Sequence, residues 1–129
     1  MASPTVHTVA ECKRRGWRAC IVEKWIPQAR RRVDAFGFGD LLVMDGEPGA
    51  LLIQACTTGD APKRVHKIHE ECTADALRWL KSGNRIEVWG WAKRGKVGKR
   101  KLWTLKTYPV TAYAIEEGID YVQPDADET

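Results

Sequence analysis

Apolar residues recur along the chain at two spacings, one typical of helices and one typical of strands. From Asp60 onward they return every three or four residues, which predicts a long amphipathic helix that ends at residues 82–84, Ser-Gly-Asn. Asp60 is a suitable N-cap, and Pro62 fits the first turn, where a missing N–H costs nothing. A second helix is expected over residues 6–15, since Gly16 is a natural helix stop.

The remaining apolar runs are short and are separated by turn residues, as in strands. Pro27 closes the first run, and the turn at residues 45–49 joins the next two as an antiparallel hairpin. The strands are expected over residues 17–26, 40–44, 50–56, 85–92 and 101–105.

This order of elements, α-β-β-β-α-β-β, predicts an α/β fold. A mixed sheet of about five strands would be flanked by two helices, and the long helix would form a right-handed crossover between parallel strands. We expect one domain over residues 1–115, followed by an acidic C-terminal tail over residues 116–129.

Charge is distributed unevenly between these two parts. All 21 Lys and Arg residues lie at or before Lys106. Residues 1–115 contain these 21 basic residues and eleven acidic residues, so this part of the chain has a net charge of +10. A surface this basic attracts polyanions through steering and through release of phosphate counterions. A basic surface can also serve solubility. The positive charge alone therefore has two explanations, DNA binding and solubility.

Composition narrows the class of protein further. With 43% hydrophobic and 29% charged residues, the 129-residue chain has the profile of a globular domain. No apolar run approaches the roughly 20 residues of a membrane span, and no secretory signal is visible, so we expect no membrane association and a cytoplasmic location.

The cysteines and histidines give only a weak metal signal. The four cysteines form no CxxC pair, which argues against a zinc ribbon or a thioredoxin-like site. His66, His69 and Cys72 follow one another at three-residue spacing and could share a metal. However, His69 and Cys72 also fall on the apolar face of the long helix, so packing is the simpler interpretation.

A stronger signal comes from two polar residues at neighbouring strand ends. Asp40 opens the first strand of the expected hairpin, and Gln54 stands near the end of the second, so the two lie close together. Because side chains alternate, Gln54 and Cys56 share a face while Ala55 points away. Either polar residue alone could cap a turn or a strand end. Together, in a basic chain, they indicate a site for a hard cation such as Mg²⁺.

The segment GFGDLLVMDGEPGALLIQAC resembles the metal-binding hairpin of the PD-(D/E)xK nuclease superfamily. Asp40 stands where that family's metal-binding Asp opens the second core strand, and Gln54 stands in the position of the Glu that ends the third. The segments RVDAFGFGDLLVM, LLIQACTTG and KRVHKI are also similar to a branch of small bacterial and phage proteins resembling Holliday-junction resolvases. The likeness covers residues 22–91. It implies a restriction-endonuclease-like core, Mg²⁺ (or Mn²⁺) as cofactor, and metal-assisted hydrolysis of DNA phosphodiester bonds.

The chain departs from the family pattern at the catalytic lysine. Cys56 occupies that position, and a thiol supplies no fixed positive charge. The start of the long helix offers Lys63, Arg64 and Lys67 instead. Lys67 projects roughly opposite the apolar stripe of the helix, so Lys63 in the first turn is the better candidate.

The resemblance also implies a further acidic ligand. Glu23 inside the first strand is preferred over Glu11 on the first helix, and Asp34 is a third choice that could instead pair with the neighbouring arginines. The predicted metal ligands are therefore Asp40, Gln54 and Glu23, with Glu11 as the alternative, and the predicted catalytic residues are these three and Lys63.

Contacts with DNA are expected mainly from a glycine-rich basic loop between Trp91 and Trp103. Its cations can follow phosphates, and nothing in it reads bases, so recognition of DNA shape is expected. The predicted DNA-binding residues are Lys93, Arg94, Lys96, Lys99, Arg100 and Lys101 of this loop, with Arg30, Arg31, Arg32 and Lys67.

The sequence thus predicts a metal-dependent DNA endonuclease with selectivity for DNA structure. Resolvases cut two strands symmetrically, so a homodimer is expected. The alternative is a catalytically degenerate protein of the same fold that only binds DNA, which Gln54 and Cys56 favour. Binding of a divalent cation distinguishes the two. A nucleotide-handling enzyme has little support, because no glycine-rich loop opens a helix.

Overall fold

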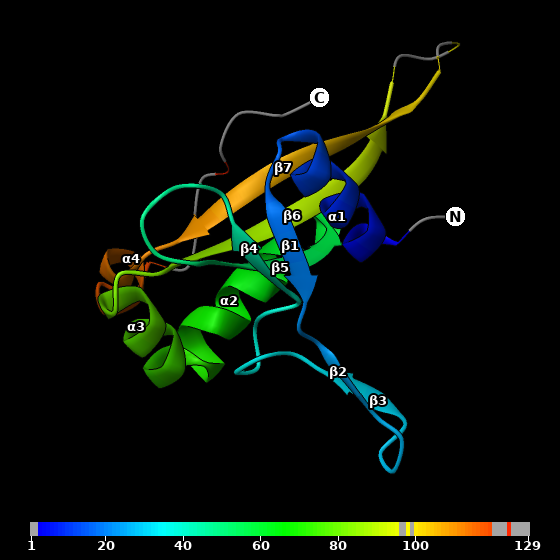
Figure 1. Ribbon diagram of the computed structural model, residues 1–129. Helices are drawn as coiled ribbons and strands as arrows, with labels where there is room; N and C mark the ends of the chain where they lie inside the picture. The colour runs from blue at the N-terminus through cyan, green and yellow to red at the C-terminus, as the bar shows by residue number, and fades with distance from the viewer. Residues whose placement is uncertain (1–2, 96–97, 99, 120–123, 125–129) are drawn as a thin grey trace.

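The computed structural model describes residues 3–95, 98, 100–119 and 124. A mixed five-stranded sheet in the order β1-β4-β5-β6-β7 forms the body, and a separate two-stranded sheet, β2-β3, projects from it (Figure 1). The elements are α1 (Pro4–Arg14), β1 (Arg18–Ile21), β2 (Lys24–Ile26), β3 (Arg31–Val33), β4 (Leu41–Met44), β5 (Leu51–Thr57), the 3₁₀ helix η1 (Thr58–Asp60), α2 (Ala61–Glu71), α3 (Thr73–Lys81), β6 (Arg85–Arg94), β7 (Leu102–Val110) and α4 (Ala112–Glu116).

Strand pairing confirms the α/β class and the mixed sheet. β1, β4 and β5 pair antiparallel in turn, β5 and β6 pair in parallel, and β6 and β7 form a long antiparallel hairpin. The parallel pair is joined through α2 and α3, as the expected crossover requires.

Two apolar cores lie on opposite faces of the sheet. Alternation in β5 divides its side chains, so that Leu51 and Ile53 join the core under α1 while Leu52 and Cys56 join the core under α2 and α3. Gln54 therefore shares the α2 face with Cys56, and Ala55 packs toward the α1 side, as predicted. Fully burying a Leu or Ile side chain contributes about 1.5–3 kcal/mol, so these two cores are the main source of stability.

The expected single helix after Asp60 is wrong, because the helix breaks at Cys72. The Cys72 N–H donates to the carbonyl of Lys67, five residues back, which interrupts the regular ladder. In addition, the Thr73 hydroxyl donates to the carbonyl of His69. Apolar periodicity continues through the break, so the sequence pattern did not reveal it.

The expected strand over residues 17–26 is also wrong. The N–H groups of Val22 and Glu23 both donate to the carbonyl of Asp40 (2.8 and 3.3 Å), which ends β1 and redirects the chain. The chain then continues as β2, which pairs with β3 and not with the main sheet. Neither β3 nor the short helix α4 was predicted, so the expected count of two helices is too low.

The expected acidic tail begins within a helix. Glu116, where the acidic tail was expected to begin, is the last residue of α4 and forms an ion pair with Lys81. Residues 120–123 and 125–129 of that tail lie outside the described part of the chain. Among the described helices, none combines the length and the apolar character needed to cross a membrane.

Candidate metal centre

Three acidic side chains meet where the β2-β3 sheet joins the body of the protein. Glu23 directly precedes β2, Asp34 directly follows β3, and Asp40 directly precedes β4. One carboxylate oxygen of each lies within 4.8 Å of those of the other two. Oxygen ligands of one Mg²⁺ lie about 2.0–2.1 Å from the ion and hence up to about 4.2 Å apart. A small contraction would therefore bring all three carboxylates onto one cation.

A tight loop brings Asp34 and Asp40 together. Ala35 and Gly39 pair as an isolated β-bridge, with hydrogen bonds of 2.8 and 3.0 Å in the two directions, so the residues flanking the bridge become neighbours. Gly39 must be glycine, because a Cβ there would lie only 2.4 Å from the side chain of Leu52. Residues 34–40, with the sequence DAFGFGD, therefore form one tight loop with a carboxylate at each end.

Asp40 is the most firmly held of the three carboxylates. It is buried, and its carboxylate accepts a hydrogen bond from the Ala55 N–H at 2.8 Å. Its own N–H donates to the carbonyl of Ile53 at 2.9 Å. The Asp40 side chain therefore extends the hydrogen bonding between β4 and β5 by one residue before β4 begins.

Gln54 reaches the cluster from β5 and is almost completely buried, with 2% of its surface exposed. Its Nε2 donates to Asp34 at 3.0 Å and lies 3.4 and 3.5 Å from the two oxygens of Asp40. Its Oε1 is buried and has no hydrogen-bond partner among the described residues. An unsatisfied buried oxygen costs about 1–3 kcal/mol. Rotation of the amide would turn Oε1 toward the carboxylates, where a cation would satisfy it, so this residue fits a cation site.

Electrostatics favour a counter-ion at this position. Burial, then the hydrogen bond with Asp34 and the negative charges of Asp34 and Glu23, raise the pKa of Asp40 to about 8, against an ordinary value of 3.8. Three carboxylates this close resist simultaneous ionisation. A divalent cation would remove that resistance, because it supplies the missing positive charge.

Basic side chains adjoin the carboxylates. Arg32 Nη1 lies 3.4 Å from Glu23 Oε1. Arg31, Arg32 and Lys67 line a hollow of about 220 Å³ together with Asp34. The arrangement places the carboxylate cluster beside a pocket lined by three basic side chains, a combination suited to a phosphate group with a metal ion.

The structure brings together Glu23, Asp40 and Gln54, which the sequence singled out, and adds Asp34 as a full member. Glu11 lies elsewhere. It is on α1, where its carboxylate pairs with Arg14 and Arg15. The signal that could have promoted Asp34 is its symmetric position with Asp40 about the FGFG loop.

The basic candidates also differ in placement. Cys56 is buried, and burial raises the pKa of its thiol to about 12, so it remains a neutral thiol. Lys63 is exposed in the first turn of α2 and is not among the residues that line the hollow. Lys67, one turn further on, does line the hollow beside Asp34. Geometry therefore favours Lys67 over Lys63 as the basic residue of the site.

His66 and His69 on α2 and Cys72 directly after it do not form a comparable cluster. Within the described residues, Glu23, Asp34 and Asp40 are the group whose ligand atoms meet. His69 is buried and Cys72 packs against the apolar core, in agreement with the packing interpretation.

The predicted DNA-binding residues lie mainly on two projecting hairpins (Figure 1). Arg30, Arg31 and Arg32 are exposed on the β2-β3 hairpin. Lys93 and Arg94 end β6, and Arg100 and Lys101 precede β7, all of them exposed. Lys96 and Lys99 lie outside the described part of the chain.

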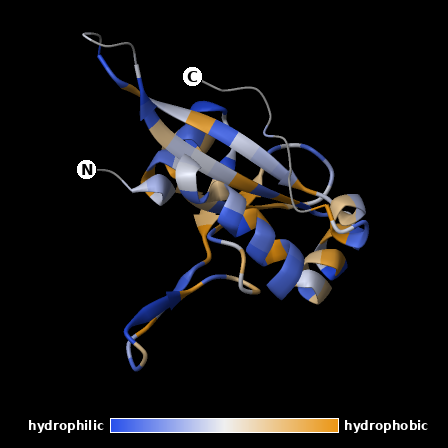
Figure 2. Ribbon diagram, turned by 180° about the vertical axis from the view of Figure 1, so that it is seen from behind, coloured by the Kyte–Doolittle hydropathy of each residue, from blue (hydrophilic) through white to orange (hydrophobic). Residues whose placement is uncertain are grey.

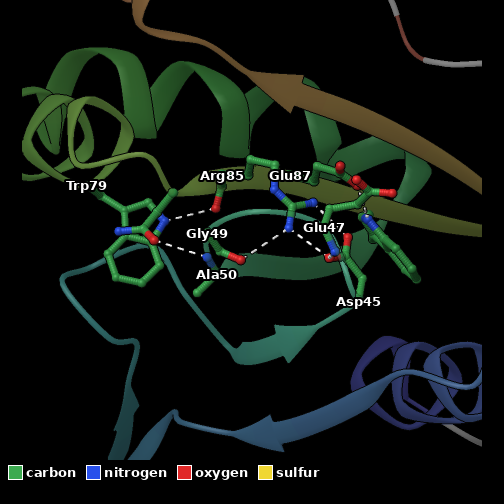
Figure 3. Close-up of polar contacts among 9 residues, drawn as sticks. Asp45, Glu47, Gly49, Ala50, Trp79, Arg85 and Glu87 are labelled. Atoms are coloured by element: carbon green, nitrogen blue, oxygen red, sulfur yellow. Dashed lines mark hydrogen bonds and ion pairs between the residues drawn. The ribbon is translucent and has the colours of Figure 1, made fainter.

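A second polar cluster, at the opposite end of β5, is structural (Figure 3). Arg85 makes a bidentate ion pair with Asp45 at 2.6 and 2.8 Å, and the carbonyl of Arg85 accepts from Trp79 Nε1 at 2.8 Å. The Ala50 N–H donates to Asn84 Oδ1 at 3.0 Å. These bonds fasten the β4-β5 turn to the start of β6 and leave the carboxylate cluster as the candidate for chemistry.

Comparison of the chain with protein-family models, with curated proteins and with solved structures found no match. The functional argument therefore depends on the geometry of the carboxylate cluster and on the charges around it.

Proposed function

We propose that this protein is a divalent-cation-dependent nuclease that hydrolyses phosphodiester bonds in DNA. The observation that carries the proposal is the convergence of Glu23, Asp34 and Asp40 beside the buried amide of Gln54. That amide contacts Asp34 and Asp40 through Nε2, and its Oε1 lacks a partner among the described residues. Carboxylate and amide oxygens are the ligands that Mg²⁺ and Mn²⁺ prefer.

The order of elements supports a restriction-endonuclease-like core of the PD-(D/E)xK type. That core runs helix, three antiparallel strands, helix and a further strand, which α1, β1, β4, β5, α2-α3 and β6 reproduce. The β2-β3 hairpin would then be an insertion between the first and second core strands. Asp40 opens the second core strand and Gln54 stands near the end of the third, as in the resemblance.

Each residue has a distinct role in this proposal. Glu23, Asp34, Asp40 and Gln54 would hold the cation, which on binding lowers the pKa of water and neutralises charge on the phosphate. Lys67 takes the place of the lysine that Cys56 replaces, because its ammonium can contact the phosphate from the hollow beside Asp34. Arg31 and Arg32 provide further positive charge for the same phosphate.

A cleavage assay with matched variants tests the proposal. Labelled duplex, flap and four-way-junction DNA would be incubated with Mg²⁺ or Mn²⁺ and wild-type protein, Asp40→Asn or Asp75→Asn. Asp75 is a control carboxylate on α3 that is not part of the cluster. We expect metal-dependent cutting by the wild type and by Asp75→Asn, and a loss of about 100-fold or more in Asp40→Asn.

The preferred DNA would identify the substrate class. Wild-type protein that binds DNA and cation but cuts none of these DNAs would contradict the nuclease and leave the degenerate DNA-binding protein. Equal cutting by the wild type and Asp40→Asn would remove the cluster from the reaction.

A further inference from the structure

The β2-β3 hairpin, residues 24–33, is a strongly basic arm. It carries Lys24, Arg30, Arg31 and Arg32 and no carboxylate. Half of the surface of Trp25 is exposed (51%). Figures 1 and 2 show the arm standing away from the body in opposite views, and among the described strands β2 and β3 pair only with each other. Cations suit the phosphate backbone of a nucleic acid, and an exposed aromatic ring can stack on a base.

The base of this arm is the carboxylate cluster itself. In the β2-β3 register Lys24 pairs with Val33, so the residues just outside this pair are Glu23 and Asp34. Both chain segments that attach the arm to the body therefore carry a cluster carboxylate. An isolated two-stranded hairpin is marginally stable in water, so the order of the arm depends on how firmly its base is closed.

The base contains opposing charges that a cation would rebalance. When all three are ionised, Glu23, Asp34 and Asp40 repel one another, and Arg32 offsets part of that repulsion by its contact with Glu23 at 3.4 Å. A divalent cation would hold the three carboxylates together. It would also release Arg32, whose side chain is 62% exposed, for contact with a phosphate.

We propose that the β2-β3 arm grips the DNA backbone and that this grip is linked to cation binding at the base of the arm. The inference rests on the proposed function for the cation and the DNA, and it adds the coupling between them. By thermodynamic reciprocity, the cation must raise the affinity for DNA by the same factor as DNA raises the affinity for the cation.

Binding measurements separate this coupling from simple charge attraction. The dissociation constant for a labelled duplex would be measured at fixed salt, with EDTA or with Ca²⁺. Wild-type protein is compared with Arg30→Ala/Arg31→Ala on the arm and with Lys13→Ala/Arg18→Ala on α1 and β1. Both double variants remove two exposed charges, so a general loss of attraction affects them alike.

We expect Ca²⁺ to tighten DNA binding by the wild type and the α1-β1 variant by about fivefold or more. In the arm variant the affinity should fall and the Ca²⁺ enhancement should largely disappear. An arm variant that binds more weakly but keeps the full enhancement would overturn the coupling, since the phosphate would then contact the cation without help from the arm. That result would leave the proposed nuclease standing.

Hydrogen exchange tests the same link without DNA. Ca²⁺ should slow exchange of the amides of residues 24–33 in the wild type but not in Asp40→Asn. If Ca²⁺ binds the wild type and these amides exchange at an unchanged rate, the coupling is wrong. If Ca²⁺ does not bind the wild type at all, the proposed function and the coupling fail together.

Discussion

The carboxylate of Asp40 has two roles that oppose one another at neutral pH. It accepts the Ala55 N–H and so extends the β4-β5 ladder, but it also faces Asp34 and Glu23. Its pKa is raised to about 8, which means that the folded protein favours the protonated form. In the proposed function, this arrangement lowers the stability of the protein without a cation and provides ligands for the cation.

Stability in the absence of divalent cation should therefore fall as the pH rises. The contribution of protonated Asp40 is fully present below its ordinary pKa of 3.8 and is lost as the pH approaches about 8, with a slope of at most about 1.4 kcal/mol per pH unit. Asp40→Asn should flatten this dependence and raise the free energy of unfolding near pH 8. Urea denaturation in EDTA between about pH 5 and about pH 9 measures both. An Asn variant less stable than the wild type near pH 8 would contradict this description of the site.

Gln54 offers a second prediction at this scale. Gln54→Glu adds a negative charge to the cluster, so we expect tighter Mg²⁺ binding, by about tenfold, and lower stability without cation. Calorimetric titration with Mg²⁺ and denaturation in EDTA check the two effects. Gln28→Glu, an exposed position on the arm, is the matched control and should change neither by a comparable amount.

Prediction from sequence was most successful at residues whose position follows from strand alternation. Asp40 and Gln54 were placed at neighbouring strand ends by the antiparallel hairpin, and Gln54 was placed on the face of Cys56 because side chains in strands alternate. Asp34 was the third choice, because the Ala35–Gly39 bridge that brings it to Asp40 leaves no mark on apolar periodicity. The preference for Lys63 over Lys67 depended on the helix alone, without the arm that forms the other wall of the hollow.

At the scale of elements, the central strands of the body were predicted. The bounds of the two outer strands, β1 and β7 (Leu102–Val110, expected over residues 101–105), and the irregular connections were not. The hairpin of β4 and β5 and the parallel pairing of β5 with β6 follow from turn residues and from a long connecting helix. The arm was missed because β3 is an exposed Arg-Arg-Val segment with no apolar alternation. The break at Cys72 was missed because the apolar stripe continues across it.

The turn between β4 and β5 allows a stability prediction with an internal control. Gly46 and Gly49 both have positive φ, +88° and +77°, but only a Cβ at Gly49 would meet the Gly83 carbonyl, at 2.0 Å. Gly46→Ala should cost about 1 kcal/mol from backbone strain, and Gly49→Ala should cost clearly more. Thermal or chemical denaturation compares the two. Equal losses would mean that the contact between the β4-β5 turn and Gly83 is not tight in solution.

At the scale of the whole molecule, most of the predicted DNA-binding residues and the carboxylate cluster lie on or next to the projecting hairpins. The projecting hairpins carry seven of the predicted DNA-binding cations within the described residues, and the carboxylate cluster lies at the base of one of them. We propose a homodimer, because symmetric cutting of two strands needs two such sites. Sedimentation with and without DNA would test this, and a monomer in both states would contradict it.

All of these functional proposals depend on one cation at the junction of the arm and the body. Calorimetric titration of Mn²⁺ into wild-type protein, Asp34→Asn and Asp75→Asn tests that claim most directly. The structure predicts one Mn²⁺ per chain in the wild type and in Asp75→Asn, and a loss of about tenfold or more in affinity in Asp34→Asn. A wild type that binds no Mn²⁺, or an Asp34→Asn variant that binds it equally well, would contradict the cation site.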